Sequence, residues 1–270
     1  MDLLPVAFVS HGAPVSLDEP EWRERLGLWG KSIGQVKAIL VVSAHWVTQR
    51  PMFGPLDRVP LIYDFWGFPD RFYKLTYPSP VSPELGRRIA SMPGLEDLVP
   101  TPSRGLDHGM WVPLTGMFPE AIIPVLGLSL PGLSPEKLYT LGKSLAPLRE
   151  EGILLLASGG MTHNLGEIDP NLHAPPRSWA LSFDQWVVEQ VSTGNLESLF
   201  EFEDRAPQAR KSHPTLEHFA PLFVALGAAE GYSRVTFPVT GFRWGSLSLR
   251  SIQFDGGDSQ LEAPPKNRIE

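Results

Sequence analysis

Short apolar runs that alternate with helix-like segments constrain this 270-residue chain most strongly. Residues 3–10 and 38–44 (AILVVSA) are two such runs, and residues 19–34 between them have the mixed apolar and charged spacing of a helix. Residues 122–130 and 153–158 repeat the apolar pattern. A strand-helix-strand unit is typical of parallel sheets. We therefore predict an α/β fold: a single domain with a central, mostly parallel sheet flanked by helices.

Helix-capping residues and amphipathic spacing mark further helices. Ser-Pro-Glu begins the segments 82–92 and 134–150, with serine in the N-cap position and proline in the first turn. Residues 178–193 and 217–229 are predicted as two more helices, and 235–254 as one or two closing strands.

The chain shows no internal repeat, linker or low-complexity block. We expect one catalytic α/β domain over residues 1–254 and a polar C-terminal tail over 255–270, which contains two prolines.

Charge and hydropathy exclude several partners. The formal charge is −7, and no basic run is long enough to neutralise a phosphate backbone, so nucleic acid is not expected. The N-terminal segment has no basic region and no apolar stretch that could span a bilayer. We expect a cytoplasmic protein without membrane contact; whether it forms a homo-oligomer stays open.

Cysteine is absent, which removes thiolates as metal ligands or nucleophiles and directs attention to the seven histidines. His11 and His45 directly follow apolar runs, His163 lies a few residues after one, and His108 lies in a glycine-flanked turn. Side chains just past the carboxyl ends of parallel strands converge on one crevice. A shared metal or catalytic site is therefore predicted there, with His173 left as a surface residue.

The segment HPTLEH offers one further ligand. His213 and His218 are five residues apart, so on one continuous helix they cannot both face one ion. His218 shares its face with Leu222 and is expected to point inward, whereas His213 is expected at the surface. Glu217 is either a carboxylate ligand or a first-turn acid that complements the helix dipole.

Imidazole with at most one carboxylate favours a borderline ion, Fe(II) or Zn(II), one per subunit, over Ca(II) or Mg(II). Open coordination positions would permit oxygen activation or Lewis-acid chemistry.

Nine aromatic side chains lie between Trp46 and Tyr77, a density too high for an ordinary solvated loop. We predict that Tyr63, Asp64, Phe65 and Trp66 contact a flat substrate as a wall or lid. A hydrophobic cover or a dimer contact is the structural alternative for the aromatic residues, and a solvated ion pair is the alternative for Asp64.

Seven ordered blocks resemble the class III extradiol ring-cleaving dioxygenases, in particular the 4,5-DOPA dioxygenase-like branch, whose fold is related to the catalytic subunit of protocatechuate 4,5-dioxygenase. The blocks are FVSHGAP (8–14), VVSAHW (41–46), YDFWGFPDRFYKLTYP (63–78), GLDHGMWVPL (105–114), ASGGMTHNL (157–165), HPTLEHFAPL (213–222) and GSLSL (245–249).

The resemblance implies a mononuclear metal held by His11, His45 and His218. It implies His163 as the acid-base residue, near enough to be a further ligand, and His108 as a contact for the oxygens of the substrate or for O2. Where the classical subunit has a carboxylate ligand, this chain has His218 with Glu217 beside it, so both stay candidates. The implied reaction opens the ring of a small aromatic diol with O2.

Two other functions would use the same residues. A zinc-dependent hydrolase would activate water at the metal, with His163 as the base. A non-catalytic metal-binding interaction protein would need neither His108 nor His163 as acid-base groups.

Overall fold

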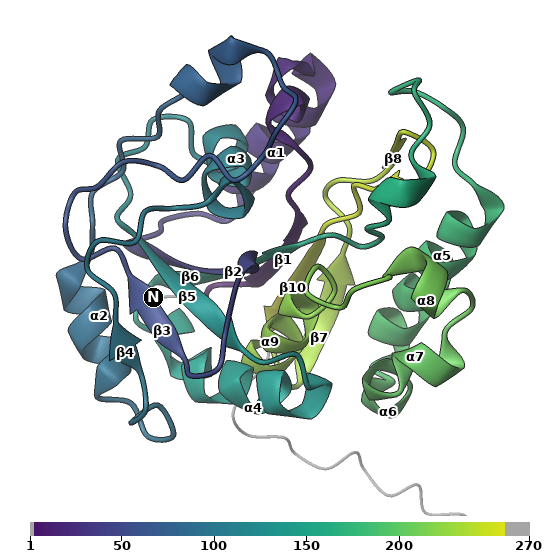
Figure 1. Cartoon of the computed structure of the whole chain (residues 1–270). Helices are drawn as coiled ribbons and strands as arrows, with labels where there is room; N and C mark the ends of the chain where they lie inside the picture. The colour runs from purple at the N-terminus through teal and green to yellow at the C-terminus, as the bar shows by residue number, and fades with distance from the viewer. Residues whose placement is uncertain (1–2, 257–270) are drawn as a thin grey trace, which may run out of the picture.

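The computed structural model describes residues 3–256, and an eight-stranded sheet runs through its centre (Figure 1). Its strand order is β4-β3-β5-β2-β6-β1-β10-β7. The strands are β1 (Val6–Ser10), β2 (Ala38–Thr48), β3 (Met52–Gly54), β4 (Val99–Pro100), β5 (Val125–Pro131), β6 (Ile153–Gly159), β7 (Tyr232–Thr236) and β10 (Ile252–Gly256); β8 (Phe242–Arg243) and β9 (Leu247–Ser248) form a separate pair.

The four central strands β5, β2, β6 and β1 are parallel to one another. On one side, β10 pairs antiparallel with β1, and β7 pairs antiparallel with β10. On the other side, β3 pairs antiparallel with β5. The predicted single α/β domain with a mostly parallel sheet is therefore confirmed, with antiparallel additions on both sides.

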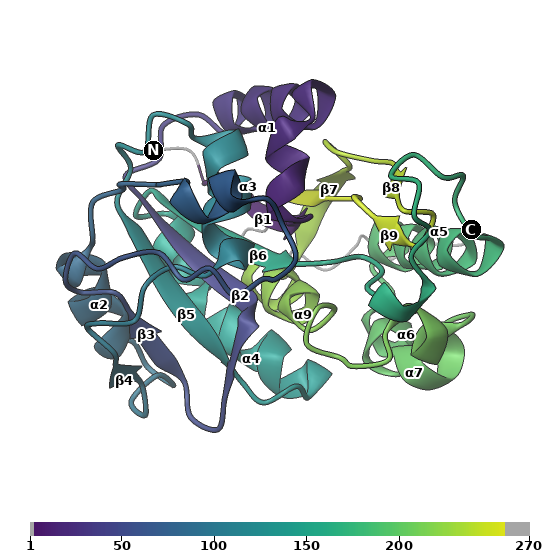
Figure 2. The ribbon, with the colours of Figure 1, turned by 45° about the horizontal axis from the view of Figure 1, so that its top comes forward.

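Helices cover both faces of the sheet, because alternate strand residues point to opposite sides. Phe8 of β1 belongs to the core beneath α2, α4 and α9, whereas its neighbour Val9 packs in the core beneath α1 and α3 (Figure 2). The helices are α1 (Pro20–Ser32), α2 (Pro83–Ala90), α3 (His108–Met117), α4 (Pro135–Leu145), α5 (Ser178–Thr193), α6 (Leu196–Phe200), α7 (Phe202–Arg205), α8 (Ala209–Ser212) and α9 (Pro221–Ala228).

The capping signal at Ser82 is confirmed, because its hydroxyl accepts a hydrogen bond from the amide of Leu85 at 3.3 Å. Helix α5, predicted from its amphipathic spacing, has the predicted bounds. The predicted helix 217–229 is wrong at its start: residues 217–220 form a turn, and α9 begins at Pro221. Asp255 and Gly256 belong to β10, and the rest of the predicted tail lies outside the described residues.

Within residues 3–256, none of the helices is both long and apolar enough to cross a bilayer.

Candidate metal centre

His11 and His45 meet at the carboxyl ends of two central strands. His11 follows the last residue of β1. His45 lies inside β2, and not after it as predicted, but the pairing of β2 with β5 shifts between Val42 and Val47. Because this irregularity interrupts the regular alternation, His45 can face the end of β1. The Nε2 atoms of His11 and His45 lie 3.2 Å apart.

His108 and His218 complete the group around these two rings. His108 is the first residue of α3, and not part of an isolated turn, and its ring centroid is 4.1 Å from that of His45. His218 lies in the turn before α9, with its ring centroid 5.3 Å from His11 and 5.0 Å from His45. The structure thus brings the four predicted side chains together.

His163 lies on the other side of His218, in the loop after β6. The two imidazoles are stacked, with 3.4 Å between ring centroids and 5° between ring planes. Two neighbouring sets of donors, with no residue in common, therefore exist. One ligand atom each from His11, His45 and His108 lie within 4.8 Å of one another, and so do one each from His163, Glu217 and His218.

Hydrogen bonds fix the tautomer of His11. Its Nδ1 lies 3.0 Å from Oγ of Ser158, and that hydroxyl donates its own proton to the carbonyl of Gly109. Nδ1 of His11 must therefore be the donor to Ser158, which leaves the Nε2 lone pair of His11 directed at the centre. Sequence reasoning missed Ser158, although a serine at the end of the apolar run ILLLAS is a polar residue in a buried strand.

Asp64 holds two of the histidines at once. Its Oδ1 accepts hydrogen bonds from the amide and Nδ1 of His108, at 3.0 and 2.9 Å. Its Oδ2 lies 3.3 Å from Nδ1 of His45. The carboxylate, predicted to contact substrate, thus lies against Nδ1 of both rings, and the Nε2 atoms point away from it.

Glu217 orients the ring of His218 in the same way, through Nδ1. Its Oε1 lies 3.1 Å from Nδ1 of His218 and also accepts from the hydroxyl of Thr215 at 2.9 Å. Nε2 of His218 is buried and has no hydrogen-bond partner among the described residues. Because α9 begins at Pro221, the interpretation of Glu217 as a first-turn helix acid is wrong.

Burial keeps these imidazoles neutral. Burial and the neighbouring imidazoles lower the pKa of His11 and His218 well below the usual value of 6.5. Burial, together with His108, lowers the pKa of His45 to about 4, and burial with His213 lowers that of His163 to about 4. For Asp64, burial raises the pKa, but the hydrogen bonds from His108 outweigh this and hold it at about 2.

These donors fit a transition-metal ion. Two imidazole nitrogens that bind one ion at about 2.0–2.1 Å lie about 3.3–3.4 Å apart in a tetrahedral site, close to the 3.2 Å between Nε2 of His11 and His45. Nε2 of His11 carries a lone pair: in the metal-free protein Nε2 of His45 can donate to it, and with a metal bound both lone pairs would face the ion. Neutral imidazoles with hydrogen-bonded Nδ1 atoms are the usual ligands of Zn(II) and Fe(II).

Close backbone packing also shapes the centre. A Cβ atom at Gly159, the last residue of β6, would lie 2.1 Å from the carbonyl oxygen of His218. The amide of the next residue, Gly160, donates to that same carbonyl at 2.8 Å. Glycine at position 159 is therefore what lets the turn with His218 approach β6.

Two histidines lie outside the ring cluster. His173 is exposed, as expected. The expectation that His213 lies at the surface is wrong: it is only 2% exposed, and its ring packs against Phe183 and Phe219. His213 was expected at the surface because it precedes the predicted helix, but residues 213–220 are not helical and the ring is carried inward.

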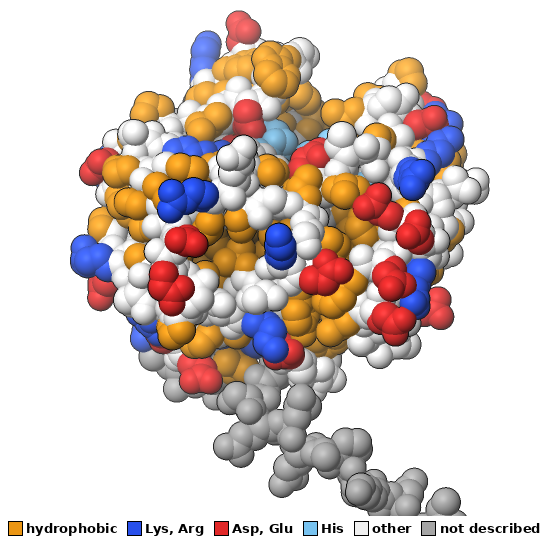
Figure 3. Space-filling view, turned by 60° about the horizontal axis from the view of Figure 1, so that its bottom comes forward, with side chains coloured by type: hydrophobic (Ala, Val, Ile, Leu, Met, Phe, Trp, Pro, Cys, Tyr) orange, Lys and Arg blue, Asp and Glu red, His pale blue; other side chains and the backbone are white. Residues whose placement is uncertain are grey.

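The aromatic segment lies partly against the centre. Phe65 is buried and its ring approaches that of His108 edge-on, with centroids 5.7 Å apart. Tyr63 packs on Phe65 and donates its hydroxyl proton to the carbonyl of Leu75. Trp66 is 84% exposed. In Figure 3, histidine side chains are visible in a recess near the top of the view.

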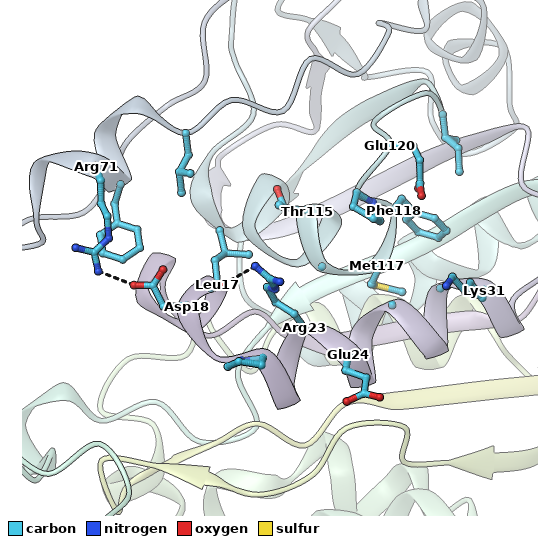
Figure 4. Close-up of a pocket in the computed structure, with 18 of the residues that line it drawn as sticks. Leu17, Asp18, Arg23, Glu24, Lys31, Arg71, Thr115, Met117, Phe118 and Glu120 are labelled. Atoms are coloured by element: carbon cyan, nitrogen blue, oxygen red, sulfur yellow. Dashed lines mark hydrogen bonds and ion pairs between the residues drawn. The ribbon is translucent and has the colours of Figure 1, made fainter.

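A cavity of about 800 Å³ lies elsewhere, between α1, the 3₁₀ helix Asp70–Lys74 and the end of α3 (Figure 4). No histidine lines it. Three cationic side chains face three acidic ones in its lining: Arg23, Lys31 and Arg71 against Asp18, Glu24 and Glu120. Because these charges balance, the lining favours neither an anionic nor a cationic ligand. The candidate chemistry of the chain therefore lies at the histidines.

Comparisons with known proteins agree with this geometry. Residues 7–243 match the family described as the catalytic LigB subunit of aromatic ring-opening dioxygenase. A "4,5-DOPA dioxygenase extradiol" from Beta vulgaris is 40% identical over 92% of this chain and 95% of that protein. Its namesake from Escherichia coli (strain K12) is 36% identical over 93% and 94%. The crystal structure of an uncharacterized Escherichia coli K12 protein superposes with a TM-score of 0.79 at 32% identity, covering 93% of this chain and all of that one.

Proposed function

Because this chain belongs to the family of the catalytic LigB subunit of aromatic ring-opening dioxygenases, we propose that it opens the ring of a catechol-type substrate with O2 by extradiol cleavage. Extradiol cleavage breaks the carbon–carbon bond beside the diol and places one atom of O2 on each new end. The relatives named for 4,5-DOPA make a catechol with an amino-acid side chain the first substrate to test.

We propose that His11, His45 and His218 hold one divalent ion, Fe(II) or Zn(II). The observation that carries this proposal is the set of three imidazoles, of which His11 and His218 have Nδ1 hydrogen-bonded to Ser158 and Glu217, and His45 has Nδ1 3.3 Å from the carboxylate of Asp64. When bound, such an ion supplies a Lewis-acidic centre for the catechol oxygens and, as Fe(II), the redox chemistry that O2 requires.

His163 is the proposed acid-base residue. Its lowered pKa keeps the ring neutral near pH 7, which is the form that can accept a phenolic proton. The stack on His218 places it beside a proposed ligand, and a substrate bound at the metal would lie within reach. His163 would later donate the same proton to the ring-opened product.

His108, Phe65 and Trp66 form the proposed substrate side. His108 directs its free Nε2 away from Asp64, so it can contact a substrate oxygen or O2. Phe65 packs against His108, and Trp66 offers an exposed flat ring for an aromatic substrate. The catalytic domain over 1–254, a homo-oligomer and the cytoplasmic location stay predictions.

The test is reconstitution of metal-free protein with Fe(II) under anaerobic conditions, and in parallel with Zn(II). We expect one O2 to be consumed per DOPA or catechol, with a new visible absorption from the ring-opened product. His163→Ala should lower kcat while metal content stays unchanged. Turnover of esters or amides by the zinc form, without any O2 uptake by the iron form, would instead establish the hydrolase.

A further inference from the structure

His213 is a buried titratable residue that the proposed reaction does not use. Its Nε2 lies 3.0 Å from the carbonyl oxygen of Met161, so Nε2 must be protonated and donate. Its Nδ1 is buried without a hydrogen-bond partner in the described part of the chain. The ring fits between Phe183 and Phe219, with centroids 5.2 and 5.0 Å away.

Burying Nδ1 of His213 without a hydrogen-bond partner destabilises the folded protein. The hydrogen bond from Nε2 of His213 to Met161 therefore needs a structural or functional reason. Met161 lies two residues before His163 in the loop after β6. Neighbouring residues tie the same loop to the same segment: the amide of His163 donates to the carbonyl of Ser212 at 2.9 Å. The side-chain amide of Asn164 donates to the carbonyl of Lys211 at 2.7 Å.

The other end of the loop is tied to the turn with His218. Gly160 donates its amide to the carbonyl of His218 at 2.8 Å. The loop with His163 and the segment 211–218 therefore form one hydrogen-bonded unit, in which His213 supplies the one buried side-chain bond between the two segments among the described residues; Ser10 and Ser246 bind the same loop from other elements. The parallel stack of His163 on His218 is a product of this unit.

We propose that His213 is a positioning residue that holds the His163 loop in register with His218. This inference rests on the proposed role of His163. This role requires a hydrogen-bond donor to the carbonyl of Met161 but no positive charge. Glutamine should therefore replace His213, because its side-chain amide can donate to the same carbonyl. Phenylalanine fills the same space but has no donor.

The test compares His213→Phe with His213→Gln, and uses Val187→Ala on α5 as a control that creates a cavity in the same core without touching the loop. For H213F we expect kcat to fall about 10- to 100-fold, as for a reacting group displaced by about 1 Å. KM and bound metal should change little. H213Q should keep most of kcat, and Val187→Ala should lower stability but not kcat.

A double-mutant cycle separates positioning from general damage. In the His163→Ala background, H213F should cost no further kcat, because the group that it positions is gone. Equal losses of kcat in both backgrounds would overturn the proposal. If H213F does not fold, His213→Met fits the same apolar space without a donor and takes its place.

NMR of the metal-free protein gives a readout that does not depend on turnover. The imidazole Cε1–Hε1 signals of His163 should move or broaden in H213F and return to their wild-type positions in H213Q. Unchanged His163 signals in H213F would refute the positioning role even if the wild-type enzyme opened catechols. Shifted signals in a protein that opens no catechol would instead refute the proposed function and leave the positioning role in place.

Discussion

The Nε2 atoms of His11 and His45 face each other at 3.2 Å, while Nδ1 of His11 is hydrogen-bonded to Ser158 and Nδ1 of His45 lies 3.3 Å from the carboxylate of Asp64. The separation of the two Nε2 atoms is close to the one that a shared ion would impose, so a bound ion should stabilise the fold directly. We expect Zn(II) or Fe(II) to raise Tm of chelator-treated protein, by the equivalent of about 3 kcal/mol at 100 times the dissociation constant. Calorimetry with and without metal measures this, and His11→Ala should abolish the difference. Equal Tm values with and without metal in the wild type would contradict a site built from these rings.

The third ligand can be identified by comparing His218 with His108. His218→Ala should reduce bound metal strongly. The substitution removes Nε2, which is buried without a partner among the described residues, from a ring whose Nδ1 already contacts Glu217. His108→Ala should keep its metal and lose turnover. Metal analysis after dialysis against a weak chelator distinguishes them. The reverse result would assign the site to His11, His45 and His108.

Asp64→Asn tests whether the bridging carboxylate orients His45. An amide can still accept from His108 with its oxygen, but its NH2 group would then face the Nδ1–H of His45. Metal affinity should fall about 10- to 100-fold, as is usual when a residue that supports a ligand is changed. Competition with a chromogenic chelator gives the affinity. Asp18→Asn is the matched control, because Asp18 forms an exposed ion pair with Arg71.

Gly159→Ala should displace the turn with His218. The added methyl group would lie 2.1 Å from the carbonyl of His218, so the turn must move. We expect a loss of about 1–3 kcal/mol in the free energy of unfolding, as for overpacked cores, and weaker metal binding. Gly160→Ala is the control, because the nearest atom to its Cβ would be 3.6 Å away. Similar losses in both variants would contradict this account.

The burial of His213 makes stability depend on pH. Burial lowers its pKa from 6.5 to about 4, so the folded chain keeps the ring neutral while the unfolded chain protonates it. Its contribution is complete above pH 6.5 and is lost as the pH falls from 6.5 to 4, by about 3 kcal/mol. Urea unfolding of metal-free wild type and His213→Gln at several pH values should show the wild type losing about 3 kcal/mol more stability than the variant as the pH falls from 6.5 to 4. A difference that stays constant would mean that the native ring titrates normally.

Local patterns in the sequence predicted much of the sheet and the general place of the site. The apolar runs marked β1, β2, β5 and β6, and the residues just past strand ends led to His11 and His163. Helix α3 was not predicted from the sequence. It is buried on nearly all sides and contains glycine and an internal proline, so its sequence shows no amphipathic stripe.

Long-range contacts explain what the sequence could not show. The pairing shift in β2 depends on β5, and the double role of Asp64 depends on a loop that meets α3. His213 was predicted at the surface because it precedes the expected helix 217–229, but the segment before Pro221 is a turn that carries its ring between Phe183 and Phe219. Each of these features arises from partners distant along the chain, which periodicity does not report.

The pairing of β1 with β10 has a consequence for how the protein is made. Val6 pairs with Phe254, so β1 gains this neighbour only after all of the chain between the two strands has been synthesised. Until then one edge of β1 can pair with foreign strands. Because His11 follows β1 directly, a low growth temperature, which weakens association between exposed apolar strands, should favour recovery of chains that can load metal over aggregated ones.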